Sequence, residues 1–255
     1  MMRRETQNIL LVLVGGALLK ISITGAYLQY VKPSHRYWLL GGGAVMLVLA
    51  LVSIARDLFG KRATEDPEHA HHDADDHDDH DVDGHQHQAR SAWLLVVPVL
   101  AIFLIAPPAL GADSINRADT RVATTRVASG TSKMAFSPLP PGNPVPVTMS
   151  DFSARASFDS LNSLTNREVQ LTGFIAVQGK DTYLARLVIA CCAADAFPVK
   201  VKLAGGDLTG LTNDTWLHVV GRLRPGTGTL TDEYVSTLDV RSITRIHQPE
   251  NPYET

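Results

Sequence analysis

Two long apolar stretches near the N-terminus limit what this chain can fold into. Residues 9–31 contain a single charged side chain, that of Lys20, and residues 37–55 contain none. A helix needs about 20 consecutive apolar residues to cross the hydrocarbon core of a bilayer. A short polar turn, 32–36, joins the stretches, so we expect an antiparallel membrane hairpin over 1–64. A signal peptide is the alternative for the first stretch, but its apolar region is too long and another span follows at once.

A third span is expected at 91–111, centred on the apolar residues 92–110, although three prolines interrupt it. Lys and Arg residues favour the cytoplasmic side of membrane helices. They predict a cytoplasmic N-terminus, a cytoplasmic loop after the hairpin and an extracytoplasmic C-terminal half. The basic residues Arg117, Arg121 and Arg126 argue for the reverse orientation.

Glycines and one lysine in the spans indicate a membrane partner. Gly15, Gly16, Gly25 and the run 41–43 permit close helix approach, within the hairpin or against another protein. Lys20 is costly at mid-membrane and predicts a protein contact or a wet cavity, with snorkelling as the alternative. Because three helices are few for a transport pathway, we expect another membrane protein as the partner.

Residues 65–90 form a His/Asp-rich loop that we expect to be disordered. It carries ten acidic residues, no Lys or Arg before Arg90, and seven histidines: His69, His71, His72, His77, His80, His85 and His87. Imidazole and carboxylate are ligands of divalent cations, which predicts weak, multi-site, exchangeable binding of ions such as Zn²⁺. A solvated acidic linker and a pH-sensing segment are the alternatives.

The C-terminal part divides into a linker and a domain. Residues 112–150 are rich in Pro, Ser and Thr and predict an extended tether. The domain, 151–248, begins with a short helix expected over 158–165. Five strands are then expected at 169–177, 182–190, 197–203, 215–224 and 234–246. Gly173 and Gly221 inside two of them favour a small, strongly coiled barrel, OB-like, with a β-sandwich as the alternative.

The overall fold class expected is therefore a membrane α-helical N-terminal region of three spans followed by an all-β C-terminal domain. Few aromatics and no basic stripe accompany the strands, and the net charge is −3. These features predict no nucleic-acid partner.

The two cysteines of the chain are adjacent, and an aspartate follows them closely. Cys191, Cys192 and Asp195 lie where the second domain strand ends, a usual place for functional loops. Neighbouring strand residues point to opposite faces, so both thiols reach one ion only if the backbone turns there. Three interpretations stay open: a thiolate metal site, two buried inert cysteines, and redox chemistry. His218 and His247 could complete a coordination sphere.

The segment from Cys191 to Ala196, CCAADA, with the preceding LARLVI strand, resembles the DUF1980 family of bacterial membrane proteins. The stretches 106–118 and 30–33 are also similar to that family. The resemblance covers nearly the whole chain. It implies a membrane hairpin, a further span and a C-terminal domain. It also implies an adjacent predicted permease, with zinc-responsive regulation of some members, and no enzymatic activity.

We therefore expect a multi-pass cell-membrane protein that acts as the accessory subunit of a permease in divalent-metal binding or homeostasis. Zinc is the expected ion, and the lipid bilayer and the permease are the expected partners. One alternative is an extracytoplasmic β-barrel module that binds a protein or envelope partner without metal. A second alternative is a thiol-redox protein.

Overall fold

The computed structural model describes residues 4–60, 100, 109–117 and 135–255. The chain divides into two compact units. One contains residues 1–27 and 34–107, and the other contains residues 28–33 and 108–255. The His/Asp loop and nearly all of the third predicted span lie outside the described residues.

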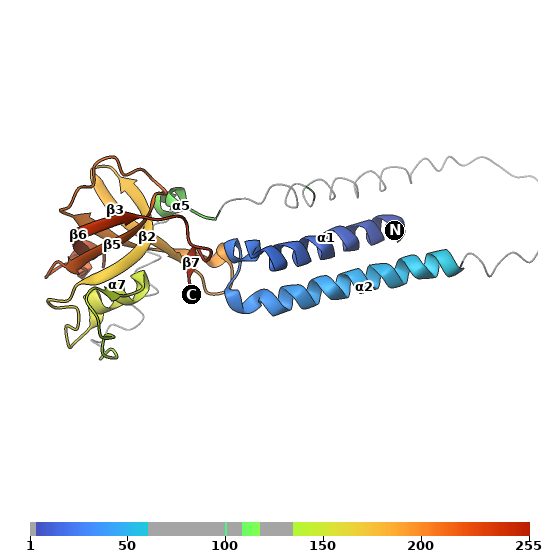
Figure 1. Ribbon diagram of the computed structural model, residues 1–255, viewed down its shortest axis with the longest axis horizontal. Coiled ribbons are helices and arrows are strands. Elements are labelled where there is room, and N and C mark those ends of the chain that lie inside the picture. The colour runs from blue at the N-terminus through green and yellow to red at the C-terminus, as the bar shows by residue number, and fades with distance from the viewer. Residues whose placement is uncertain (1–3, 61–99, 101–108, 118–134) are drawn as a thin grey trace, which may run out of the picture. The chain divides into compact units, whose positions relative to one another are not determined.

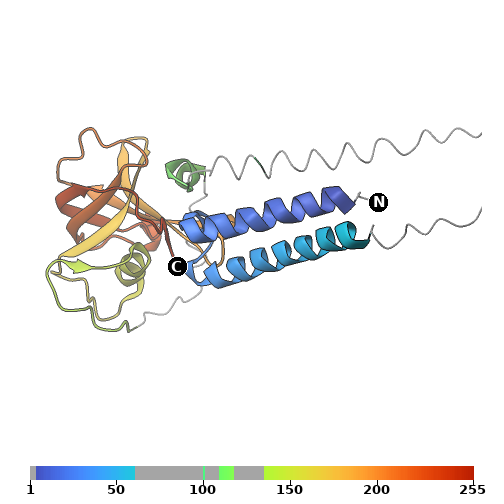
Figure 2. The ribbon, with the colours of Figure 1, turned by 45° about the vertical axis from the view of Figure 1, so that its right-hand side comes forward.

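The first unit contains two antiparallel helices, α1 (Arg4–Thr24) and α2 (Arg36–Gly60), which run side by side in both views (Figures 1 and 2). Both are long and apolar enough to cross a membrane. Gly15 and Gly43 mark their closest approach, because a Cβ on either would lie 3.0 Å from the other's carbonyl oxygen. The predicted use of glycine within the hairpin is confirmed at these two positions.

The first helix is shorter than the predicted span 9–31. It ends at Thr24, and Gly25 follows with φ +81°, a left-handed backbone that ends a helix. Two short 3-10 helices, η1 (Ala26–Gln29) and η2 (Pro33–His35), then lead into α2. The residues between them, 28–33, belong to the second unit.

The second unit is built on one seven-stranded sheet. Five long strands correspond to the five predicted ones: β2 (Val169–Gln178), β3 (Asp181–Val188), β4 (Phe197–Ala204), β5 (Trp216–Leu223) and β6 (Thr237–Arg245). Two short strands, β1 (Val145–Pro146) and β7 (Tyr253–Glu254), were not predicted, and each adds a parallel pairing. The sheet-rich C-terminal domain is confirmed, but the predicted OB-like barrel is not.

The strand order is β1-β2-β5-β6-β4-β3-β7, with a further antiparallel pairing of β2 with β3. Gly173 and Gly221 allow two close crossings in this sheet. A Cβ on Gly173 would lie 2.5 Å from the carbonyl oxygen of Ala185, and one on Gly221 would lie 2.5 Å from that of Asp239. Glycine is needed at both positions, because any side chain would meet backbone there.

Two hydrophobic clusters hold the second unit together. The larger one lies between the sheet and α7 (Met149–Phe158), and includes Met149, Phe152, Leu171, Leu184 and Leu217. The smaller one packs the other face of β2 and β3 against α5 (Ala112–Arg117). Ile115, Phe174, Trp216 and Tyr253 are buried in this smaller cluster.

Two predictions about this region are wrong. The helix expected over 158–165 instead ends at Phe158, where the backbone of the C-cap Asp159 becomes extended. The described parts of the expected tether, 112–150, also pack into the domain, since Ala112, Ile115 and Val145 are buried. These few apolar side chains are enough to dock short elements on the sheet.

Candidate functional site

The loop between β3 and β4 carries both cysteines of the chain. It leaves β3 after Val188, passes through Cys191 and Cys192, and forms the 3-10 helix η3 (Ala193–Asp195) before β4 begins. Cys192 is the extended N-cap of η3, and the Asp195 N–H donates to its carbonyl oxygen at 3.0 Å. The chain therefore turns at the cysteines, as a common orientation of the two thiols requires.

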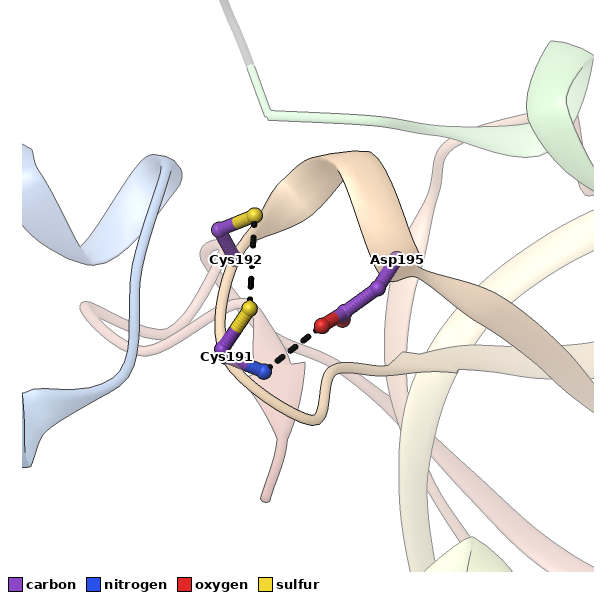
Figure 3. Close-up of side chains that lie close together, drawn as sticks. All are labelled: Cys191, Cys192 and Asp195. Atoms are coloured by element: carbon purple, nitrogen blue, oxygen red, sulfur yellow. Dashed lines mark hydrogen bonds between the residues drawn. The ribbon is translucent and has the colours of Figure 1, made fainter.

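Asp195 organises the loop through both of its carboxylate oxygens. The Ala190 N–H donates to Oδ1 at 2.8 Å, and the Cys191 N–H donates to Oδ2 at 2.8 Å (Figure 3). Backbone donors that bond an ionised carboxylate favour its charged form. The Cys191 side chain and these N–H groups hold the pKa of Asp195 at about 2. The carboxylate is therefore ionised at neutral pH.

The two thiols and the carboxylate converge on one point (Figure 3). The Sγ atoms of Cys191 and Cys192 lie 3.7 Å apart. One ligand atom from each of Cys191, Cys192 and Asp195 can be chosen so that all three lie within 4.8 Å of one another. Cys191 is exposed and Cys192 is half-buried. The interpretation as two buried, inert cysteines is therefore wrong.

The chemistry of the thiols follows from the neighbouring negative charge. Hydrogen bonding to Asp195, then to Cys192, raises the pKa of Cys191 to about 11. A thiol with a raised pKa is mainly protonated at neutral pH and is a poor nucleophile. A cation bound at the three ligand atoms would replace that proton.

The segment 28–33 pairs with the outer side of this loop. Val31 and Cys192 form an isolated antiparallel bridge. The Ala193 N–H donates to the Tyr30 carbonyl at 2.7 Å, and the Lys32 N–H donates to the Cys191 carbonyl at 3.4 Å. Tyr253 of β7 donates through its hydroxyl to the Gln29 carbonyl at 3.1 Å. The cysteine loop is thus held by main-chain contacts on one side and by Asp195 on the other.

The other predicted ligands lie apart from this cluster. His218 is within β5, where its Nδ1 hydrogen-bonds the Thr172 hydroxyl at 2.8 Å, and His247 is exposed after β6. Neither belongs to the three-residue group. The seven histidines of the loop, His69, His71, His72, His77, His80, His85 and His87, lie outside the described residues.

Sequence reasoning missed the residues that surround the loop. Residues 29–32 contact the cysteine loop and Tyr253, which lie more than 150 residues away in the sequence. No local sequence pattern predicts contacts of this kind. Arg186 was also passed over, although it is the only charge within the apolar run 184–189 and is buried.

Comparison with known proteins assigns the chain to a family. Residues 7–120 match the model of the DUF1980 N-terminal domain, and residues 155–254 match that of the DUF1980 C-terminal domain. Neither the curated proteins nor the solved structures include a match to this chain. The two matches together cover most of the chain, including both helices, the sheet and the cysteine loop, so this protein belongs to the DUF1980 family.

Proposed function

We propose that this protein is a membrane-anchored accessory subunit of a permease, and that it binds a divalent metal ion, zinc, at Cys191, Cys192 and Asp195. The observation that carries this proposal is the 3.7 Å separation of the two Sγ atoms beside an ionised carboxylate. Thiolate and carboxylate oxygen are both ligands of Zn²⁺ in proteins.

The sulfur geometry supports coordination of one ion better than a disulfide. Zn–S bonds of about 2.3 Å in a tetrahedral arrangement place two sulfurs roughly 3.8 Å apart. A disulfide would need about 2.05 Å. The observed 3.7 Å is close to the first value, so little movement of the side chains is needed to admit the ion.

Three protein ligands would leave the fourth position of a tetrahedral ion open. Such a position is typical of zinc sites that exchange a ligand, whereas structural zinc sites are closed by four protein ligands. Both Asp195 oxygens already accept a main-chain N–H, and each still has a lone pair for an ion. The site would therefore present or sense zinc rather than stabilise the fold, and the His/Asp loop would collect ions on the other side of the membrane.

The topology proposed is multi-pass with an extracytoplasmic C-terminal domain. The pairing of Val31 with Cys192 supports it, because residues 28–33, which join the two helices in sequence, belong to the same compact unit as the sheet. Helix α2 returns the chain to the opposite side, so the chain has to cross once more before Ala109. The predicted span 91–111 would supply that crossing.

The surface of the helices supports a membrane partner. Tyr37 and Trp38, at the start of α2, are 81% and 80% exposed, as expected of aromatic anchors at a membrane interface. Gly16, Gly41 and Gly42 have open space where a Cβ would be. These glycines are not used by the hairpin and would allow a permease helix to approach closely.

An OB-like barrel remains our interpretation of the sheet. The pairings of β2 with β3, β3 with β4, β4 with β6, β6 with β5 and β5 with β2 follow one another in a ring, which supports it. Such a fold alone does not decide function. The alternative, a metal-free binding module for an envelope partner, would be favoured if the cysteine site binds no zinc. The raised pKa of Cys191 disfavours the other alternative, a thiol-redox protein.

The test is zinc titration by calorimetry on the full chain in detergent under reducing conditions. The seven loop histidines are first replaced by glutamine, so that only the cysteine site can give a tight signal. We expect one zinc per chain, which Cys191→Ser and Cys192→Ser each abolish. The matched control is Asp207→Asn, since Asp207 also accepts a main-chain N–H but lies in another loop. Equal affinity in the cysteine variants would refute the site.

A further inference from the structure

A cavity of about 470 Å³ lies in the sheet unit, apart from the cysteine cluster. Its walls come from the start of α7, from β2 and β3, and from the residues around β7. The side chains that line it and carry the argument are Gln170, Arg186, Asn251 and the carboxylate of Glu254. A concave site with a few converging polar groups is the usual form of a small-molecule site.

The cavity contains a buried cation. Arg186 is only 8% exposed, and desolvation lowers its pKa. Its guanidinium lies 5.0 Å from the centre of the Trp216 ring, and it donates to the carbonyls of Asn251 at 2.8 Å and Thr172 at 3.4 Å. Among the described residues, its Nε has no hydrogen-bond partner and its guanidinium forms no ion pair. A buried charge without a counter-ion is costly, and an anion would relieve that cost.

The carboxylate of Glu254 lines the same cavity and its negative charge acts on Arg186, but its oxygens are engaged by the start of α7. Glu254 accepts from the N–H groups of Met149 and Ser150 at 2.7 and 3.0 Å, and from the Ser150 hydroxyl at 2.6 Å. It thereby satisfies the first turn of α7 and compensates the positive end of that helix. Its charge still disfavours a dianion in the cavity, so a ligand with a single negative charge fits best.

A second unsatisfied atom defines the rest of the ligand. The buried Oδ1 of Asn251 accepts no hydrogen bond from the part of the chain that the structure describes. Gln170, half-buried on the wall formed by β2, also makes no side-chain hydrogen bond among the described residues. A ligand with a hydroxyl or amino donor beside its negative group could use these amides.

We propose that this cavity binds a small monocarboxylate that carries a hydrogen-bond donor, with its carboxylate on Arg186 and its donor toward Asn251. The planar guanidinium suits a carboxylate because it can donate two parallel N–H groups to the two oxygens. This site is independent of the cysteine cluster.

The test uses the full chain in detergent, with binding measured by calorimetry and by the shift in thermal unfolding. The probes are glycolate, acetate and inorganic phosphate as sodium salts, with sodium chloride at matched ionic strength. We expect binding of glycolate, weaker binding of acetate, and no stabilisation by phosphate beyond that of chloride. Arg186→Gln should weaken glycolate binding at least about tenfold, because it removes a charge-assisted hydrogen bond.

Two further variants keep the test decisive if Arg186→Gln does not fold. Gln170→Leu changes only the wall and should weaken glycolate binding roughly two- to tenfold. Arg222→Gln is the control, because Arg222 pairs with Glu168 and does not line the cavity. Cys191→Ser should leave glycolate binding unchanged. Absence of glycolate binding, equal stabilisation by phosphate, or full binding by Gln170→Leu would overturn the proposal.

Discussion

Replacement of Asp195 by asparagine should make the Cys191 thiol react faster. The neighbouring carboxylate is the main cause that raises the pKa of Cys191 from 9.0 to about 11. At about pH 8 this rise reduces the thiolate fraction roughly hundredfold. The more basic thiolate is intrinsically more nucleophilic, with a Brønsted coefficient of about 0.45, which restores roughly eightfold. The net effect is a rate roughly tenfold below that of an ordinary thiol.

The assay follows thiol–disulfide exchange with dithionitrobenzoate, read as the absorbance of the released thionitrobenzoate. The parent is Cys192→Ser, so that the chain has a single thiol. Adding Asp195→Asn should raise the second-order rate constant by up to about tenfold at about pH 8. It should also move the rise of the rate with pH to lower pH, because the negative charge that opposes ionisation is gone.

The control is Asp207→Asn in the same parent, which removes a carboxylate that caps the Thr209 N–H and should leave the rate unchanged. An unchanged or slower rate in Asp195→Asn would refute the reasoning. It would mean that the carboxylate does not act on the thiol, and that the three groups do not form one electrostatic unit.

Two other predictions concern the ion and the sheet. Zinc affinity should rise with pH, by about tenfold per pH unit for each thiol proton displaced, because a thiol has to lose its proton to bind the ion. Calorimetry at about pH 6, 7 and 8 measures this slope, and a flat profile would exclude thiolate ligands. Gly173→Ala should destabilise the domain by about 1–3 kcal/mol or more, since the new Cβ would meet the Ala185 carbonyl at 2.5 Å. Urea unfolding measures the loss against Thr209→Ala, an exposed control, and equal stability of the two variants would contradict the close crossing.

Local pattern was a good guide to the elements of this protein. Alternating apolar residues such as Val169, Leu171 and Ile175 indicated the first long strand, and short apolar runs between turn residues indicated the other four. Apolar stretches without charge likewise indicated α1 and α2. The helix expected over 158–165 was misplaced because Phe152 and Met149 are the residues that α7 buries, while Leu161 is 68% exposed.

The candidate site was predicted only in its composition. The residue types at 191, 192 and 195 indicated a metal site, but adjacent thiols diverge in a strand, and only the turn into η3 brings the sulfurs to 3.7 Å. The hydrogen bonds that Asp195 accepts from the Ala190 and Cys191 N–H groups also depend on that turn. His218 is a residue type that binds metal ions. The register of β2 with β5 places it opposite Thr172, and its ring hydrogen-bonds the Thr172 hydroxyl instead.

Hydrophobic periodicity and residue type are local properties, and they were enough to indicate α1, α2, the five long strands and the ligand chemistry available to this chain. Contacts between distant segments depend on how the sheet closes and on what packs at its edges. The tertiary structure alone therefore decided that residues 29–32 hold the cysteine loop, and that Glu254 satisfies α7. It also decided that Arg186 lies buried beside a cavity and forms no ion pair with any residue that the structure describes, because its surroundings come from β2, β5 and the segment near β7.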